Sequence, residues 1–266
     1  MKRSLSVLLA VLSLSSASLI FAQKSADQTP ECNPGRPTVS TPATLTPAGY
    51  LQFENGGIYA SGIGEFASQF GANQVTRLAV NSRFQFLALS EPVARSKDAS
   101  GHGSFDAGGV SAGIQSVLKH GEGMRPTVSA SYIRLLYAGT APDIDIGTAQ
   151  NSAILLVSMD MAGFHFDVNG LASEQKEAAL RRAQFGETLS ISHPLGKVTI
   201  SGELWHFSQP LTRGNAIGNL WAASYQLRKN LVADAGVEHG LTSTSTQWEG
   251  FAGFTYLLPH RLWRAR

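Results

Sequence analysis

The chain has 266 residues, of which 43% are hydrophobic and only 15% are charged, with 27 Gly, 11 Pro and a single Cys. A soluble domain usually carries about 25% charged residues, so this chain is short of charge without being rich in apolar side chains. The composition excludes a disordered tail, a coiled coil and a disulfide-stapled scaffold.

The formal net charge of +2 depends on Lys2 and Arg3, without which 19 basic and 19 acidic residues remain. A neutral chain without a basic stripe gives no electrostatic reason to expect a nucleic-acid partner.

The first 22 residues have the pattern of a cleaved secretory signal. Lys2 and Arg3 precede an apolar stretch from Leu5 to Leu14, and Ile20-Phe21-Ala22 offers a small-residue cleavage site. The apolar stretch is shorter than the roughly 20 residues that a membrane-spanning helix needs. We therefore predict a signal peptide over 1–22 and export of the mature chain.

Residues 23–48 are rich in Pro and Thr, with prolines at 30, 34, 37, 42 and 47. Such a segment lacks the apolar side chains needed for a core, and we predict an extended periplasmic leader. Cys32 lies in this leader and has no second cysteine with which to form an internal disulfide, so we interpret it as an incidental thiol.

From about residue 49 the hydrophobic pattern has a period of two. Phe164, Phe166 and Val168 alternate with His165, Asp167 and Asn169, which is typical of a strand with one apolar and one polar face. Outside a possible short helical turn in 173–182, no helical stripe appears. The candidate strands are 49–56, 75–80, 83–90, 108–119, 126–138, 151–161, 164–172, 184–193, 198–207, 217–227, 231–239 and 248–257.

The connections between these strands alternate between short and long, as in outer-membrane barrels with short periplasmic turns and longer outer loops. The long connections are 57–74, 91–107, 139–150, 173–183, 208–216 and 240–247. Lipid tolerates spanning backbone only as helix or closed barrel. We predict an all-β, closed up-and-down antiparallel transmembrane β-barrel of about 12 strands over 49–258, followed by a tail over 259–266.

Aromatic residues near the predicted strand ends, such as Trp205, Trp221 and Trp248, fit the girdles of a membrane barrel. In the alternative, a soluble two-sheet sandwich, the same residues form the core.

The last third of the sequence resembles a known family. A strand over 223–228, a polar turn at Asn230, an Asp234-Ala235-Gly236 strand, the loop Gly240-Leu241-Thr242 and the strand Gly253-Phe254-Thr255-Tyr256 are similar to the closing hairpins of the transporter-like outer-membrane barrels called "putative MetA-pathway of phenol degradation". Ala79 to Phe86 resembles that family's early hairpin. The resemblance implies passage of small aromatic compounds and brings no catalytic residues.

The chain departs from many such barrels at its C-terminus, because a tail follows the last strand. Either Tyr256 or Trp263 then serves as the terminal aromatic residue that the barrel-assembly machinery reads.

If the apolar faces meet lipid, the opposite faces point into the lumen, since an Arg or Lys facing lipid at mid-bilayer costs roughly 2–4 kcal/mol. The predicted lumen-lining residues are His165, Asp167, Asn169, Glu203, Asp234, Glu238, Lys119 and Gln115. Two interpretations stay open: these side chains line a polar pore, or they pair with one another and plug a narrow barrel.

An enzymatic alternative depends on His206 and Ser208, which share one face of a strand. With an acidic residue, this pair has the logic of a base-activated nucleophile, and outer-membrane lipid A deacylases have a similar His-x-Ser arrangement. The nearest acids, Glu203 and Glu238, cannot be placed beside His206 from the sequence. No phosphate-binding glycine loop and no metal-ligand spacing appears, so we expect neither a cofactor nor a metal.

Together these patterns predict a non-enzymatic channel for passive passage of small, hydrophobic or aromatic solutes. We expect a monomer in the bacterial outer membrane, inserted by the barrel-assembly machinery and in contact with the lipid bilayer and lipopolysaccharide. A third hypothesis is a non-conducting structural or adhesive barrel whose loops 57–74 and 91–107 bind a partner.

Overall fold

The computed structural model describes residues 30–63, 66–141, 148–212 and 214–263, and in them the fold is all-β. No helix in those ranges has the length and apolar character needed to cross a bilayer. The strands are β1 (Leu51–Ile63), β2 (Phe66–Ala79), β3 (Phe84–Lys97), β4 (Gly103–Asp106), β5 (Val110–Lys119), β6 (Thr127–Tyr137), β7 (Thr148–Met161), β8 (Phe164–Glu177), β9 (Leu180–Leu195), β10 (Val198–Gln209), β11 (Gly214–Arg228), β12 (Leu231–Gly240) and β13 (Trp248–Leu257).

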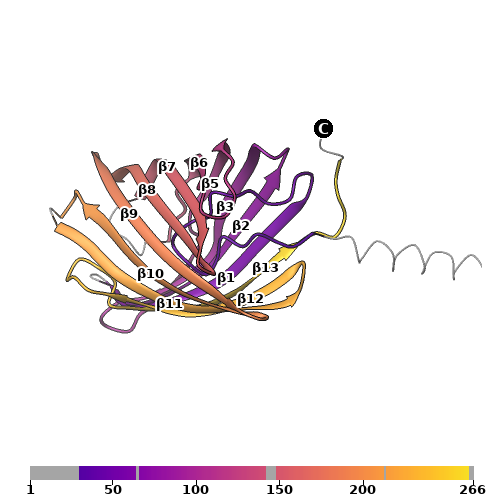
Figure 1. The fold of residues 1–266 in the computed structure, drawn as a ribbon. Helices are drawn as coiled ribbons and strands as arrows, with labels where there is room; N and C mark the ends of the chain where they lie inside the picture. The colour runs from indigo at the N-terminus through magenta and orange to yellow at the C-terminus, as the bar shows by residue number, and fades with distance from the viewer. Residues whose placement is uncertain (1–29, 64–65, 142–147, 213, 264–266) are drawn as a thin grey trace, which may run out of the picture.

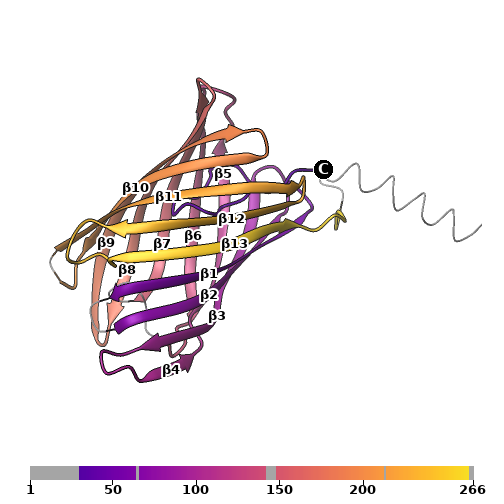
Figure 2. The same ribbon diagram turned by 90° about the horizontal axis from the view of Figure 1, so that it is seen from below.

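Twelve of the strands form a closed antiparallel barrel (Figures 1 and 2). Each barrel strand pairs with its neighbours in sequence, and β1 pairs with β13 from Gln52↔Leu257 to Ser61↔Trp248. The β2–β3 pairing completes the ring. The short strand β4 adds to the end of β3 alone. The predicted up-and-down barrel is confirmed, and a closed ring leaves no edge strand within the wall.

Several strands are longer than the sequence predicted, because they continue at the end opposite the termini. The predicted loop 57–74 is mostly paired strand, with Tyr59 opposite Phe70. The predicted loop and helical turn over 173–183 is wrong in the same way, since β8 and β9 pair as far as Glu177↔Leu180. Neither segment shows sustained alternation of apolar and polar side chains, but the backbone hydrogen bonds of a hairpin do not require it.

The two faces of the wall have opposite chemistry. Phe86, Leu204 and Trp221 point outward and are 56%, 57% and 63% exposed. Gln52, Gln85 and Gln115 point inward and are no more than 1% exposed. Large apolar side chains lie outside and polar ones inside, which is the reverse of their distribution in a soluble domain. The single closed sheet excludes the alternative of a two-sheet sandwich.

The barrel has a terminal end, at which β1 begins and β13 ends. The connections at this end are 80–83, 120–126, 162–163, 196–197 and 229–230. The tail folds back onto this rim, where the Leu262 amide donates to the Gly49 carbonyl at 2.8 Å and Trp263 Nε1 donates to the Val80 carbonyl at 3.1 Å.

The segment before β1 lies inside the barrel (Figure 1). The sequence predicted an extended periplasmic leader that buries nothing. The described part, residues 30–48, is extended, but Ser40 and Ala43 are completely buried. A segment with few large apolar side chains becomes buried here because the lumen supplies polar partners rather than an apolar core.

On SDS–polyacrylamide gels, we expect the unheated protein to migrate as a compact folded species and the boiled protein to migrate more slowly, as an unfolded chain. A closed barrel resists unfolding by detergent because it has no open strand edge. Migration at the same position with and without heating would contradict the closed barrel.

Candidate functional site in the barrel lumen

Five of the eight predicted lumenal residues are buried on the inward face: Gln115, Asp167, Asn169, Glu203 and Asp234. They come from β5, β8, β10 and β12, whose alternation places every second side chain inside. Most of them bind residues 30–48, which we call the leader.

Glu203 on β10 accepts three hydrogen bonds from two adjacent leader residues. Its carboxylate accepts from the Val39 amide and the Ser40 amide, both at 2.7 Å, and from the Ser40 hydroxyl. The same hydroxyl lies 2.7 Å from Thr188 Oγ1 on β9. Glu203 is 4% exposed, so these bonds supply the partners that a buried carboxylate requires.

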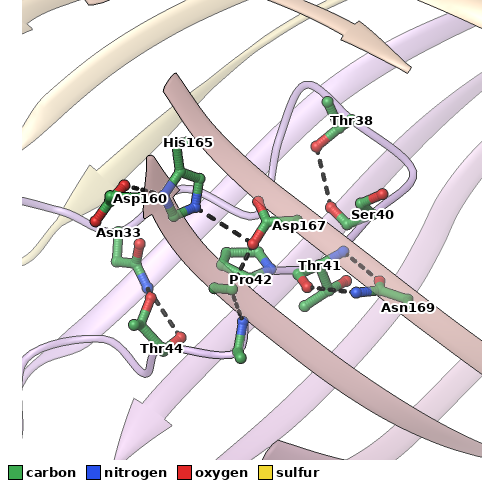
Figure 3. A network of polar contacts seen from close by, with 12 residues as sticks. Asn33, Thr38, Ser40, Thr41, Pro42, Thr44, Asp160, His165, Asp167 and Asn169 are labelled. Carbon is green, nitrogen blue, oxygen red and sulfur yellow. Dashed lines mark hydrogen bonds and ion pairs between the residues drawn. The ribbon is translucent and has the colours of Figure 1, made fainter. Parts of the chain in front are cut away.

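Asn169 on β8 binds the leader backbone reciprocally (Figure 3). Its Oδ1 accepts from the Thr41 amide at 2.7 Å and its Nδ2 donates to the Thr41 carbonyl at 3.0 Å. One residue further, Gln115 Nε2 donates to the Pro42 carbonyl at 3.0 Å. Ser158 Oγ then accepts from the Ala43 amide at 2.7 Å and donates to Asp167.

Arg36 provides the main charged contact of the leader. Its guanidinium lies 3.1 Å from Asp234 Oδ1 and donates to Asn73 Oδ1 at 3.3 Å. Gly56 and Gly253 face each other across the β1–β13 pair, and a Cβ on either would lie within 2.5 to 2.8 Å of this guanidinium. Two paired glycines therefore make the space that Arg36 occupies.

The other three predicted residues lie nearer the two ends of the barrel. His165 sits near the terminal end, 2.7 Å from Asp160 and 3.3 Å from Asp167 (Figure 3). Glu238 is opposite Glu249 near the loop end. Lys119 is exposed and follows a register shift in β5 that pairs it with Val128.

An apolar wall inside the barrel was not predicted. It faces a cavity of about 210 Å³ on one side of the leader, which Arg36, Glu54 and Arg77 also line. The wall consists of Val75, Leu87, Leu89, Ile133, Ile154 and Leu156. The signal for it was the run Ile154-Leu155-Leu156-Val157, because a strand that is apolar at consecutive positions carries apolar side chains on both faces.

A second cavity of about 350 Å³ lies on the other side of the leader and opens toward the terminal end. Its lining is polar and includes Asp167, Ser190, Ser201 and Lys197. Arg36 and Thr38 line both cavities, so the leader separates an apolar compartment from a polar one.

The His206 and Ser208 pair lies on the outward face of β10. The structure supplies an acid that the sequence could not place, since His206 Nδ1 is 3.0 Å from Glu187 Oε1 on β9. Ser208 Oγ instead accepts from the Phe185 amide at 2.8 Å, and no hydrogen bond among the described residues joins it to His206. Within the described ranges, no three His, Cys, Asp or Glu side chains gather as metal ligands.

The fold is that of outer-membrane β-barrels. A channel described as the COG4313 outer membrane channel from Pseudomonas putida F1 aligns with a TM-score of 0.59 and 12% identity, over 86% of this chain and all of that one. The NanC porin aligns with a TM-score of 0.54 and 8% identity, over 77% of this chain and 98% of that one. The KdgM porin, solved with a disordered oligogalacturonate, aligns with a TM-score of 0.50 and 13% identity, with the same coverage.

No protein-family model and no curated protein matches this chain. The resemblance to the MetA-pathway family is therefore not confirmed, whereas the outer-membrane β-barrel fold is.

Cys32 reports on the seating of the leader. Its amide donates to the Lys229 carbonyl at 2.9 Å, and burial raises the pKa of its thiol to about 11. Because the thiolate is the reactive form, we expect the rate of alkylation by iodoacetamide to be still rising tenfold per pH unit at pH 10. In the urea-unfolded chain the rate is half-maximal near pH 9 and levels off above about pH 10. A half-maximal rate near pH 9 in the folded protein would contradict a buried thiol.

Proposed function

We propose that this chain is an outer-membrane channel that lets small, partly apolar solutes cross passively through the barrel lumen. The proposal includes a monomer that the barrel-assembly machinery inserts into the lipopolysaccharide-containing membrane, with its terminal end toward the periplasm. The single observation that carries it is the apolar wall beside a lumenal cavity, within a closed barrel whose outer face is also apolar.

The outer face supports a location in lipid. Exposed apolar side chains follow the barrel around its circumference, including Phe84, Phe86, Ile114, Leu155, Val168, Leu189, Ile200, Leu204, Trp221 and Val237. In water such a belt is an aggregation site, whereas lipid solvates it, and a closed sheet exposes no open strand edge to the bilayer.

The inner wall supports the class of solute. A cavity of about 150 Å³ lined by apolar side chains in another protein holds benzene, so the 210 Å³ cavity here is of a size for one ring. Arg77, Asn73 and Glu54 line the same cavity. Arg77 and Glu54 neutralise each other at 2.8 Å, which favours an uncharged solute with a single polar group over an ion.

We predict that Ile154→Asn slows the entry of a neutral monocyclic solute such as phenol into proteoliposomes by about fivefold. Losing one apolar contact weakens burial of the ring by ~1 kcal/mol. Entry is measured by fluorescence of an enclosed reporter.

Ser152→Asn is the matched control, because Ser152 points inward from the same strand but does not line the apolar cavity. Equal slowing in both variants would argue against a role for the apolar wall. Entry no faster than into protein-free vesicles, both for the wild type and for Glu203→Ala, would overturn the channel and favour a non-conducting barrel.

A second candidate function is lipid hydrolysis on the outer surface, which the contact between His206 and Glu187 favours. The acid orients the ring as in a Ser-His-acid triad. The arrangement lacks a contact between His206 and Ser208, whose hydroxyl oxygen is engaged by Phe185. This is why we rank hydrolysis below passage.

We expect no release of fatty acid from lipopolysaccharide by the wild type, and the same background from Ser208→Ala, measured by mass spectrometry of extracted lipids. Release that disappears in Ser208→Ala, with unchanged heat-modifiable migration, would instead establish the hydrolase.

A further inference from the structure

We propose that the lumen carries a binding site for an extended polypeptide backbone, that its occupant is residues 30–47 of this same chain, and that this segment closes the channel until it is displaced. The inference rests on the proposed channel function and adds to it the state in which passage is blocked.

The first argument is that wall side chains bind the leader backbone at many positions. Leader amides donate to wall side chains at seven positions: Asn33, Gly35, Val39, Ser40, Thr41, Ala43 and Thr46. Wall side chains donate in return to the carbonyls of Asn33, Thr41, Pro42 and Ala43. A buried segment outside a sheet or helix has no other way to satisfy its backbone.

The proline content of the leader suits this site. Each proline lacks an amide hydrogen and fixes its φ angle, so the five prolines at 30, 34, 37, 42 and 47 reduce the number of donors to be satisfied. They also favour an extended chain that loses less entropy on docking. A composition that cannot form a core is thus well matched to a polar lumen.

The second argument is that the wall is shaped for one leader side chain. Gly56 and Gly253 leave open the space that the Arg36 guanidinium fills, and Asp234 supplies its counter-charge there. Both glycines lie in regular paired strand. Glycine weakens a strand interior and there often marks a close approach of another group, and here that group is Arg36.

The third argument is position. The leader crosses between the 210 Å³ and 350 Å³ cavities and lines both. Its contacts reach β1, β8, β10 and β12, which lie around the circumference. A solute entering one compartment meets the leader before it reaches the other.

Water can form the same hydrogen bonds that join the leader to the wall. These contacts are polar, and Val39, next to the Glu203 contact, remains 42% exposed. A permanent filler of a barrel is expected to be apolar and interlocked, as in a packed core. This leader is instead held by hydrogen bonds whose net contribution is small once water competes for the same groups.

The decisive experiment is a disulfide lock. Ser40 Oγ and Thr188 Oγ1 lie 2.7 Å apart, so Ser40→Cys with Thr188→Cys, in a Cys32→Ser background, places two thiols within bonding reach. We expect the oxidised protein to pass solute at least tenfold more slowly than the same protein after dithiothreitol. Equal rates in the two redox states would overturn the plug and leave the channel standing.

A release series supplies the complementary test, with Cys32 as the reporter. Glu203→Ala removes the acceptor of three leader bonds, and Gly56→Ala places a Cβ where the Arg36 guanidinium lies. In both variants we expect faster solute passage and faster Cys32 alkylation at pH 8, by up to about a hundredfold as the thiol pKa returns from about 11 to its ordinary 9.0.

Gln184→Ala is the matched control, because Gln184 is a buried inward side chain on β9 whose bonds go to Ser173 and Gln175 rather than to the leader. Alkylation in Glu203→Ala that is as slow as in the wild type would overturn the docked leader. Fast alkylation without any passage of solute would overturn the channel itself, so the two failures are distinguishable.

Discussion

The closed ring of strands is the constraint on which the other features depend. Once β1 pairs with β13 and β2 with β3, each side chain of the wall faces either outward or into one shared lumen. The outward set is apolar and the inward set largely polar, so Gln52, Gln115 and Glu203 are buried without an apolar core around them. Buried polar groups need partners, and the leader supplies them to Gln52, Gln115 and Glu203. Closure of the ring therefore creates the polar surface on which the leader docks.

The lumen is chemically divided. On one side of the leader, Leu87 on β3, Ile133 on β6 and Leu156 on β7 line the same cavity and give it an apolar wall. On the other side, serines and Asp167 line a polar space that opens toward the terminal end. A uniformly polar pore would favour hydrated ions, and a uniformly apolar one would exclude water. A divided lumen instead suits a molecule with an apolar body and a polar tip, which finds a compatible surface on each side of the leader.

The sequence predicted the features that depend on a hydrophobic period of two, namely the strands and the faces of their side chains. Alternation in 164–169 gave the correct face for Asp167 and Asn169, and the strand count of the barrel was right. It failed where alternation stops: much of 57–74 and 173–183 is paired strand, because hairpin pairing depends on backbone hydrogen bonds rather than on an alternating side-chain pattern. Alternation predicted that Lys119 faces the lumen, but a register shift in β5 just before Lys119 pairs this residue with Val128. The contact between His206 and Glu187 depends on strand register, and the docked leader depends on tertiary contacts, so no local pattern contained either.

The leader is joined to β1 almost directly, with Gly49 bonded to Ala79 at the rim, and this tether changes the energetics of its docking. A linked segment competes for its site at an effective concentration in the millimolar range or above for a short flexible linker, so weak individual bonds suffice to keep it seated. The same tether brings it back after each release. Net contributions of about 0.5–1.5 kcal/mol per hydrogen bond then make the seated population sensitive to the loss of a single acceptor. Glu203 is such an acceptor, since it accepts three leader bonds.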